Sequence, residues 1–294
     1  MQRFTEVQLD REALGLTMED SQSHQSPQLG FYRLHSPCLL SVETHDENGE
    51  PGIGTAFHIG DGYLVTARHV IEGRQLTNLI PARDGSISLD SVEVIYPSDP
   101  TVDLALLKTN FSLDYYMKHV NFWGRDDVTK VDHIQIGGHL DDWIDDGLVL
   151  MKVIAFGYPP IPTSPRPELV AVRGEINAII DPYVGSKHPL FVISPMARGG
   201  FSGGPVLSEN GWLLGIVTSS LLTNHAVPEL GYGAALTVEP LWNLLAENKI
   251  FPASNADILF ELRHGWNLKE EDFPFGAEKL GKLKAGGTSA CEMD

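Results

Sequence analysis

Cysteine is scarce in this sequence, with only Cys38 and Cys291 among 294 residues. A secreted domain stapled by disulfides carries several paired cysteines, so this class of protein is excluded. We interpret the two as unrelated free thiols. Their scarcity favours a reducing compartment.

Basic residues are also few, with 21 lysines and arginines against 39 acidic residues and a net charge of -18. Such an excess of negative charge argues against nucleic acid or an anionic membrane as a partner. No apolar run reaches the roughly 18 residues that a membrane span needs. The first thirty residues show no apolar core of a signal peptide. We therefore expect a soluble, cytoplasmic protein.

Short apolar segments separated by turns are abundant from Pro37 onward. Asp61-Gly62 and Glu209-Asn210-Gly211 stand between apolar runs, a pattern that predicts β-hairpins. Helical spacing is confined to residues 238–248 and 256–264. This pattern indicates an all-β barrel or sandwich.

The most informative segment is the glycine-rich stretch around Ser202. The residues from Gly200 to Pro205 read G-F-S-G-G-P. Glycines beside a serine permit a tight backbone turn that aims N–H groups at a developing oxyanion. Ser202 is therefore a candidate nucleophile, although a plain glycine-rich turn would have the same composition.

Two further residues would complete a catalytic set. His69 ends an apolar run with the residues T-A-R-H at 66–69, and Asp103 opens the run D-L-A-L-L at 103–107. An aspartate beside a buried strand needs a hydrogen-bond donor, which an imidazole N–H can supply. Each residue alone would also fit a structural role, a satisfied surface histidine or a strand-start cap.

The order His69, Asp103, Ser202 and these three motifs resemble the chymotrypsin-like serine peptidases. The likeness covers about residues 35–248 and is greatest to HtrA-like and other bacterial trypsin-like peptidases, here without a PDZ-like domain. It implies an all-β fold of two six-stranded antiparallel barrels with a C-terminal helix. The expected segments are a flexible N-terminal arm (1–30), an N-terminal β-barrel (31–125), a C-terminal β-barrel with the final helix (126–248), and a C-terminal extension with a disordered tail (249–294).

The resemblance implies a serine endopeptidase that needs no cofactor or metal and acts on a protein or peptide. Ser202 would attack the peptide carbonyl, His69 would act as base, and Asp103 would orient His69. The N–H groups of Gly200 and Ser202 would bind the oxyanion. The residues aligned with the substrate pocket are Met196, Thr218, Ser219, Ser220 and Gly231. Without an acid at the pocket floor, Met196 favours an apolar residue before the cleaved bond.

One position departs from the digestive members of the family. Phe201 stands where they carry the aspartate that pairs with a newly cleaved N-terminus, and no R-I-V-G-G activation site precedes it. We expect intrinsic activity, or activity switched by a regulatory partner, by self-association or by the N-terminal arm. Limited or regulated intracellular proteolysis fits such control.

Alternatives remain open at this point. His133, His139 and the acids Asp141, Asp142, Asp145 and Asp146 could form a metal cluster, but their spacing matches no ligand pattern and favours a solvated acidic loop. The barrel could also be a catalytically silent peptide-binding module. An α/β-hydrolase is disfavoured, because that fold places its histidine after its serine.

Overall fold

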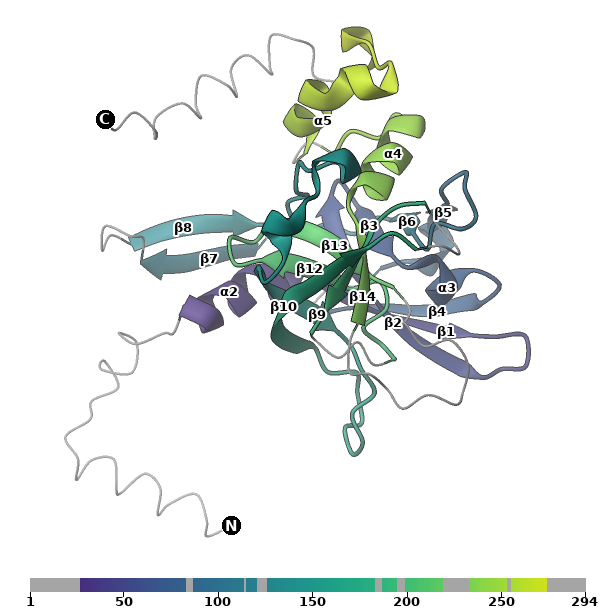
Figure 1. Ribbon diagram of the computed structural model, residues 1–294. Coiled ribbons are helices and arrows are strands. Elements are labelled where there is room, and N and C mark those ends of the chain that lie inside the picture. Colours follow the sequence, from purple (N-terminus) through teal and green to yellow (C-terminus); the bar gives the residue numbers. More distant parts are fainter. Residues whose placement is uncertain are drawn as a thin grey trace, which may run out of the picture.

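Two six-stranded β units make up most of the described chain (Figure 1). The computed structural model describes residues 27–82, 87–113, 115–120, 126–182, 187–194, 199–218, 233–252 and 255–273. Most of the expected N-terminal arm lies outside these residues, as do most of the tail and Cys291.

The first unit is a six-stranded antiparallel sheet in the order β4-β1-β2-β3-β6-β5. Its strands are β1 (Leu39–His45), β2 (Pro51–Gly60), β3 (Tyr63–Thr66), β4 (Gln75–Pro81), β5 (Glu93–Ile95) and β6 (Ala105–Lys108). The hairpin predicted at Asp61-Gly62 is confirmed, because both residues have positive φ (51° and 79°) between paired β2 and β3. Within the described residues the sheet stays open between β4 and the three-residue β5.

The second unit is a closed barrel in the order β10-β11-β14-β13-β12-β9, with β9 returning to β10. Its strands are β9 (Lys152–Gly157), β10 (Val170–Ile180), β11 (Leu190–Ile193), β12 (Pro205–Ser208), β13 (Leu213–Val217) and β14 (Gly233–Thr237). Closure satisfies the backbone groups that an open edge would expose. The expected double arrangement of six-stranded β units is therefore confirmed, and its first unit is a half-barrel.

The segment between the two units is part of the structure rather than a solvated linker. A hairpin of β7 (Tyr115–Val120) and β8 (Asp126–Val131), which the sequence pattern had not indicated, projects beyond the sheets (Figure 1). Ile134 and Ile136, which follow it, are fully buried. The Ile134 N–H donates to His58 O at 2.7 Å, and the Leu213 N–H donates to Gln135 O at 2.8 Å. The connection thus bonds to both units.

Apart from the short α3 (Arg68–Ile71), three α-helices occur in the described residues. They are α2 (Pro27–His35), α4 (Glu239–Glu247) and α5 (Ala256–Leu262). Helix α4 confirms the predicted helix, with Trp242 fully buried. Helix α2 begins within the segment expected as an arm, and its Phe31 ring stacks on Phe156, with 6.4 Å between centroids.

The C-terminal extension packs on the β units through a buried asparagine. Asn255 Oδ1 accepts from the Ile136 N–H at 3.1 Å, while its Nδ2 donates to Ile59 O at 3.1 Å. Asn255 is fully buried, so these bonds are made without competition from water. Residues 255–273 are therefore part of the folded body.

Cys38 is a free, fully buried thiol, and burial raises its pKa far above the usual range, so it is inert as a nucleophile. No helix in the described part of the chain is long and apolar enough to cross a membrane.

Candidate active site

His69 and Asp103 lie at the same end of two paired strands. His69 is in the short helix α3 (Arg68–Ile71), directly after β3, and Asp103 precedes β6. Strands β3 and β6 pair antiparallel with Thr66 opposite Ala105. Because the strands pair in this register, His69, three residues after Thr66, lies beside Asp103, two residues before Ala105.

The contact between these residues uses both carboxylate oxygens. Asp103 Oδ2 is 2.8 Å from His69 Nδ1, and Oδ1 accepts the His69 backbone N–H at 3.0 Å. The His69 side chain is 44% exposed and the Asp103 side chain is 26% exposed. Because a carboxylate only accepts, Nδ1 carries the proton and Nε2 is left as a base.

Ser202 lies in a tight turn shaped by glycine. Gly200 has φ of +96° and Gly203 has φ of +83°, values that side-chain-bearing residues rarely adopt. A Cβ on Gly200 would lie 2.2 Å from Tyr158 O, and one on Gly204 would lie 2.0 Å from Phe156 O. The glycines thus allow the turn to lie directly against β9 and the residues that follow it.

The same turn abuts the segment that carries His69. A Cβ on Gly203 would lie 2.7 Å from Ala67 N, two residues before His69. The Thr55 N–H donates to Ser202 O at 2.9 Å. A Cβ on Gly54 would lie 2.6 Å from Val70 Cγ1 and 3.3 Å from Ser202 O. Strand β2 therefore lies between the serine turn and helix α3. Ser202 thus lies in the same region as His69 and Asp103.

The Phe201 side chain is buried inside the second barrel, which the sequence alone did not indicate. It is only 3% exposed and packs in the apolar cluster of that barrel, together with Val206 and Val217. A Cβ on Gly157 would lie 2.7 Å from the Phe201 ring. The serine turn is thus anchored by apolar burial where digestive enzymes would use an ion pair.

The expected substrate pocket is only partly described. Thr218 follows β13, is 7% exposed, and donates its backbone N–H to Ala234 O at 3.0 Å. Met196, Ser219, Ser220 and Gly231 lie outside the described residues.

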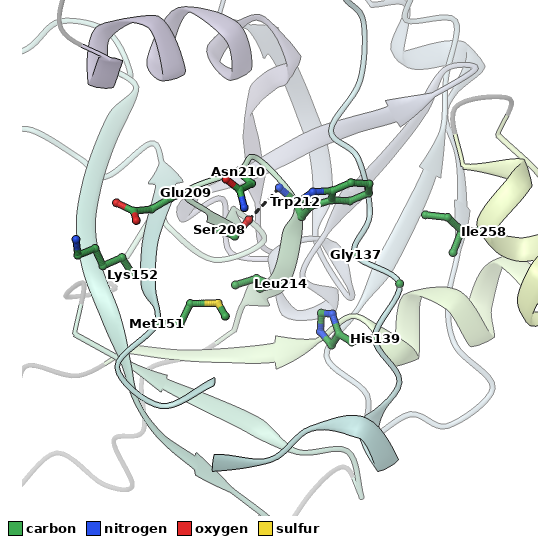
Figure 2. A pocket seen from close by; sticks show the side chains of 11 residues that line it. Gly137, His139, Met151, Lys152, Ser208, Glu209, Asn210, Trp212, Leu214 and Ile258 are labelled. Carbon is green, nitrogen blue, oxygen red and sulfur yellow. Dashed lines mark hydrogen bonds between the residues drawn. The ribbon is translucent and has the colours of Figure 1, made fainter. Parts of the chain in front are cut away.

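A separate cavity of about 630 Å³ lies on another part of the second barrel. Figure 2 shows His139 and Ile258 lining it together with the side chains of Met151, Trp212 and Leu214. Burial lowers the pKa of His139, and its Nε2 has no hydrogen-bond partner among the residues that the structure describes. None of the described residues that line it belongs to the serine turn or to the His69 segment, so this cavity is distinct from the site.

Part of the acidic loop is solvated as expected, but Asp141 is not. Asp142, Asp145 and Asp146 are exposed. Asp141 Oδ2 lies 2.6 Å from His188 Nδ1, and Thr237 Oγ1 donates to Asp141 Oδ1 at 2.7 Å.

Asp141 and His188 also lie near Glu239, and one ligand atom from each of the three falls within 4.8 Å of the others. Glu239 Oε2 accepts the Asp141 N–H at 2.6 Å, and the Asp141–His188 separation is that of a hydrogen bond. The three groups therefore satisfy one another and join the connecting segment to β14 and α4. Of the histidines considered from the sequence, His133 instead contacts Asp132 and Gln135.

Replacing His188 with phenylalanine is expected to lower the free energy of unfolding by about 3 kcal/mol. The His188 and Asp141 side chains are only 8% and 14% exposed, so the substitution leaves a carboxylate poorly solvated. Urea denaturation measures the effect. The matched control is Glu209→Gln, which breaks the exposed pair with Arg173 (51% and 54% exposed) and should cost under about 1 kcal/mol. Equal losses would contradict a buried structural network.

Comparisons with known proteins agree with this geometry. A family model described as a trypsin-like peptidase domain matches residues 54–216, more than half of the chain. No curated protein matches significantly.

Several solved structures share the fold. The Rv3671c protease from M. tuberculosis in its active form is 19% identical with a TM-score of 0.52, covering 74% of this chain and 82% of that one. The HtrA-type protease AlgWS227A with a tripeptide is 20% identical (TM-score 0.52; 77% and 64% covered). A serine endoprotease from Yersinia pestis is 21% identical (TM-score 0.51; 77% and 67% covered).

The match over residues 54–216 includes both the histidine and the serine motifs. The chain belongs to the trypsin-like peptidase family and is a serine endopeptidase.

Proposed function

We propose that Ser202, His69 and Asp103 are the catalytic triad of this endopeptidase. The observation that carries the assignment is the double contact of Asp103 with His69, through Nδ1 at 2.8 Å and the backbone N–H at 3.0 Å. This contact orients the imidazole and leaves Nε2 to take the proton of Ser202 Oγ as it attacks the peptide carbonyl. The imidazolium then gives the proton to the leaving amine.

The backbone N–H groups of Gly200 and Ser202 are proposed to bind the oxyanion of the tetrahedral intermediate. The positive φ of Gly200 supports this role, because it permits a turn whose two N–H groups converge. Burial of Phe201 between the two donors supports a turn that is held in shape without a cleaved N-terminus.

Specificity is proposed to come from Met196, Thr218, Ser219, Ser220 and Gly231. Met196 at the pocket floor would favour a small or medium apolar residue before the cleaved bond, and the segment after β13 would pair with the substrate backbone. The similar protease AlgWS227A was solved with a tripeptide, which is consistent with a peptide ligand for this fold.

We further propose limited or regulated proteolysis in the bacterial cytoplasm, with control by a regulatory partner, self-association or the N-terminal arm. The scarcity of cysteine and the buried free thiol of Cys38 support a reducing compartment. Phe201 supports control by a means other than zymogen cleavage.

Incubating the protein with a peptide library should give cleavage after Ala, Val, Leu and Met at least about tenfold more often than after Lys or Arg. The reason is that a charged side chain would lose its hydration against an apolar floor without an acidic partner. Mass spectrometry of the products measures the preference.

The same library is treated with two serine variants. Ser202→Ala should give no cleavage, whereas Ser112→Ala, at an exposed position, should cleave as wild type does. Predominant cleavage after Arg or Lys would contradict the pocket assignment. Undiminished cleavage by Ser202→Ala would contradict the nucleophile assignment.

A further inference from the structure

Thr55, in strand β2 of the first unit, bonds twice to the serine turn of the second. Its hydroxyl donates to Gly200 O at 2.6 Å, and its backbone N–H donates to Ser202 O at 2.9 Å. The hydroxyl also accepts the Tyr158 N–H at 3.1 Å. One residue thus makes three hydrogen bonds, with its hydroxyl and its backbone N–H, that join β2, the turn and the segment after β9.

The two carbonyls that Thr55 holds alternate along the chain with the two proposed oxyanion donors. The Gly200 carbonyl belongs to the peptide unit between the donor units of Gly200 N–H and Ser202 N–H. The Ser202 carbonyl belongs to the unit that follows. Because each peptide unit is planar, fixing a carbonyl restricts the torsion angles of the neighbouring units and so the directions of their N–H groups.

A third bond completes the restraint. Gly204 N–H donates to Phe201 O at 2.8 Å, which fixes the unit that carries the Ser202 N–H. The Gly200 N–H belongs to the peptide unit next to the one that ends in the Gly200 carbonyl. Its direction therefore depends on that carbonyl, which accepts from the Thr55 hydroxyl at 2.6 Å and from the Tyr158 N–H at 3.2 Å.

Thr55 is itself rigidly placed. Its side chain is fully buried, so water cannot easily replace its hydroxyl. Thr66 Oγ1 donates to Thr55 O at 2.7 Å, which joins Thr55 to the strand leading to His69. A short hydrogen bond in such a site fixes direction more strictly than one that water shares.

We propose that Thr55 is a positioning residue that sets the oxyanion-binding geometry of the Gly200–Ser202 turn from the opposite β unit. It touches no substrate atom; it acts through the two carbonyls. The inference rests on the proposed function, because it concerns the donors assigned there.

Thr55→Val keeps the size and shape of the side chain and removes only the hydroxyl. We expect kcat on a peptide substrate to fall about 10- to 100-fold with KM changed less than about threefold, because misaligning an oxyanion donor should cost less than deleting one. The Ki of a peptide boronic acid, whose tetrahedral adduct places an oxygen at the oxyanion site, should rise in parallel. Binding of an uncleaved peptide to Thr55→Val/Ser202→Ala should equal its binding to Ser202→Ala.

Two matched variants separate positioning from folding. Thr55→Ser retains a hydroxyl and should stay within about threefold of wild type. Thr77→Val removes a hydroxyl that donates to Glu43 O at 2.9 Å on the same sheet and should not change kcat. If Thr55→Val does not fold, Thr55→Ala is compared with Thr55→Ser in the same assays.

The outcomes are distinguishable. Wild-type kcat and boronate affinity in a folded Thr55→Val, with Ser202→Ala inactive, would overturn the positioning role alone. A rise in KM matched by equally weakened binding of the uncleaved peptide would also overturn it, since the two changes together would indicate a general distortion of the site. Activity in Ser202→Ala would overturn the proposed function and, with it, this inference.

Discussion

Replacing Ser202 or His69 with alanine is expected to lower kcat by about 10⁶, and the double variant should be no worse than either single one. The serine is a weak nucleophile until His69 Nε2 accepts its proton, so the two side chains act as one unit. Steady-state kinetics on a fluorogenic peptide, with the residual rate compared with the uncatalysed reaction, measures the losses.

Asp103→Asn is expected to lower kcat by about 10⁴, because the amide favours the wrong imidazole tautomer. The matched control for His69→Ala is His264→Ala, since His264 is exposed in the 3-10 turn Arg263–Trp266 and its replacement should not change kcat. Additive losses of kcat in the double variant Ser202→Ala/His69→Ala would contradict a coupled nucleophile and base. Wild-type activity in Asp103→Asn would contradict the role of Asp103.

Gly200→Ala is expected to lower kcat by at least about 10²–10³, the cost of losing an oxyanion donor. Gly200 has φ of +96°, and a methyl group there would lie 2.2 Å from Tyr158 O, so the turn must move. Backbone oxygen cannot give way as a flexible side chain can. Kinetics and boronic acid inhibition should show the loss, with circular dichroism confirming the fold.

The neighbouring glycine provides the control. A Cβ on Gly199 would meet no atom of the described residues within 4 Å, and its φ lies outside the left-handed region. Gly199→Ala should therefore retain activity within a few-fold. Equal losses in the two variants would show that the stretch tolerates no side chain for some reason other than the contact with Tyr158.

The parts of the site that local motifs specify could be predicted from the sequence. His69 and Asp103 come together because β3 and β6 pair in register, and both strands are apolar runs that the sequence marks clearly. The Asp61-Gly62 hairpin follows from local turn chemistry. The C-terminal helix follows from its apolar spacing.

Features that depend on distant partners could not be predicted. Thr55 resembles any strand threonine until Gly200, 145 residues later, is beside it. Asp141 looks like one more loop acid, and only the contact with His188 and Thr237 explains its burial. The open edge of the first sheet depends on whether β4 and β5 meet, which no local pattern specifies.

The apolar anchor of the serine turn has a consequence for how the enzyme responds to solution conditions. An N-terminal ammonium that held the turn by an ion pair would titrate with a pKa of about 8 and would be screened by salt. Phe201, 3% exposed, carries no ionisable group. The hydrophobic burial of Phe201, which holds the turn, is therefore not weakened directly by alkali or by salt. Raising the pH above 8 removes no charge on which this burial depends.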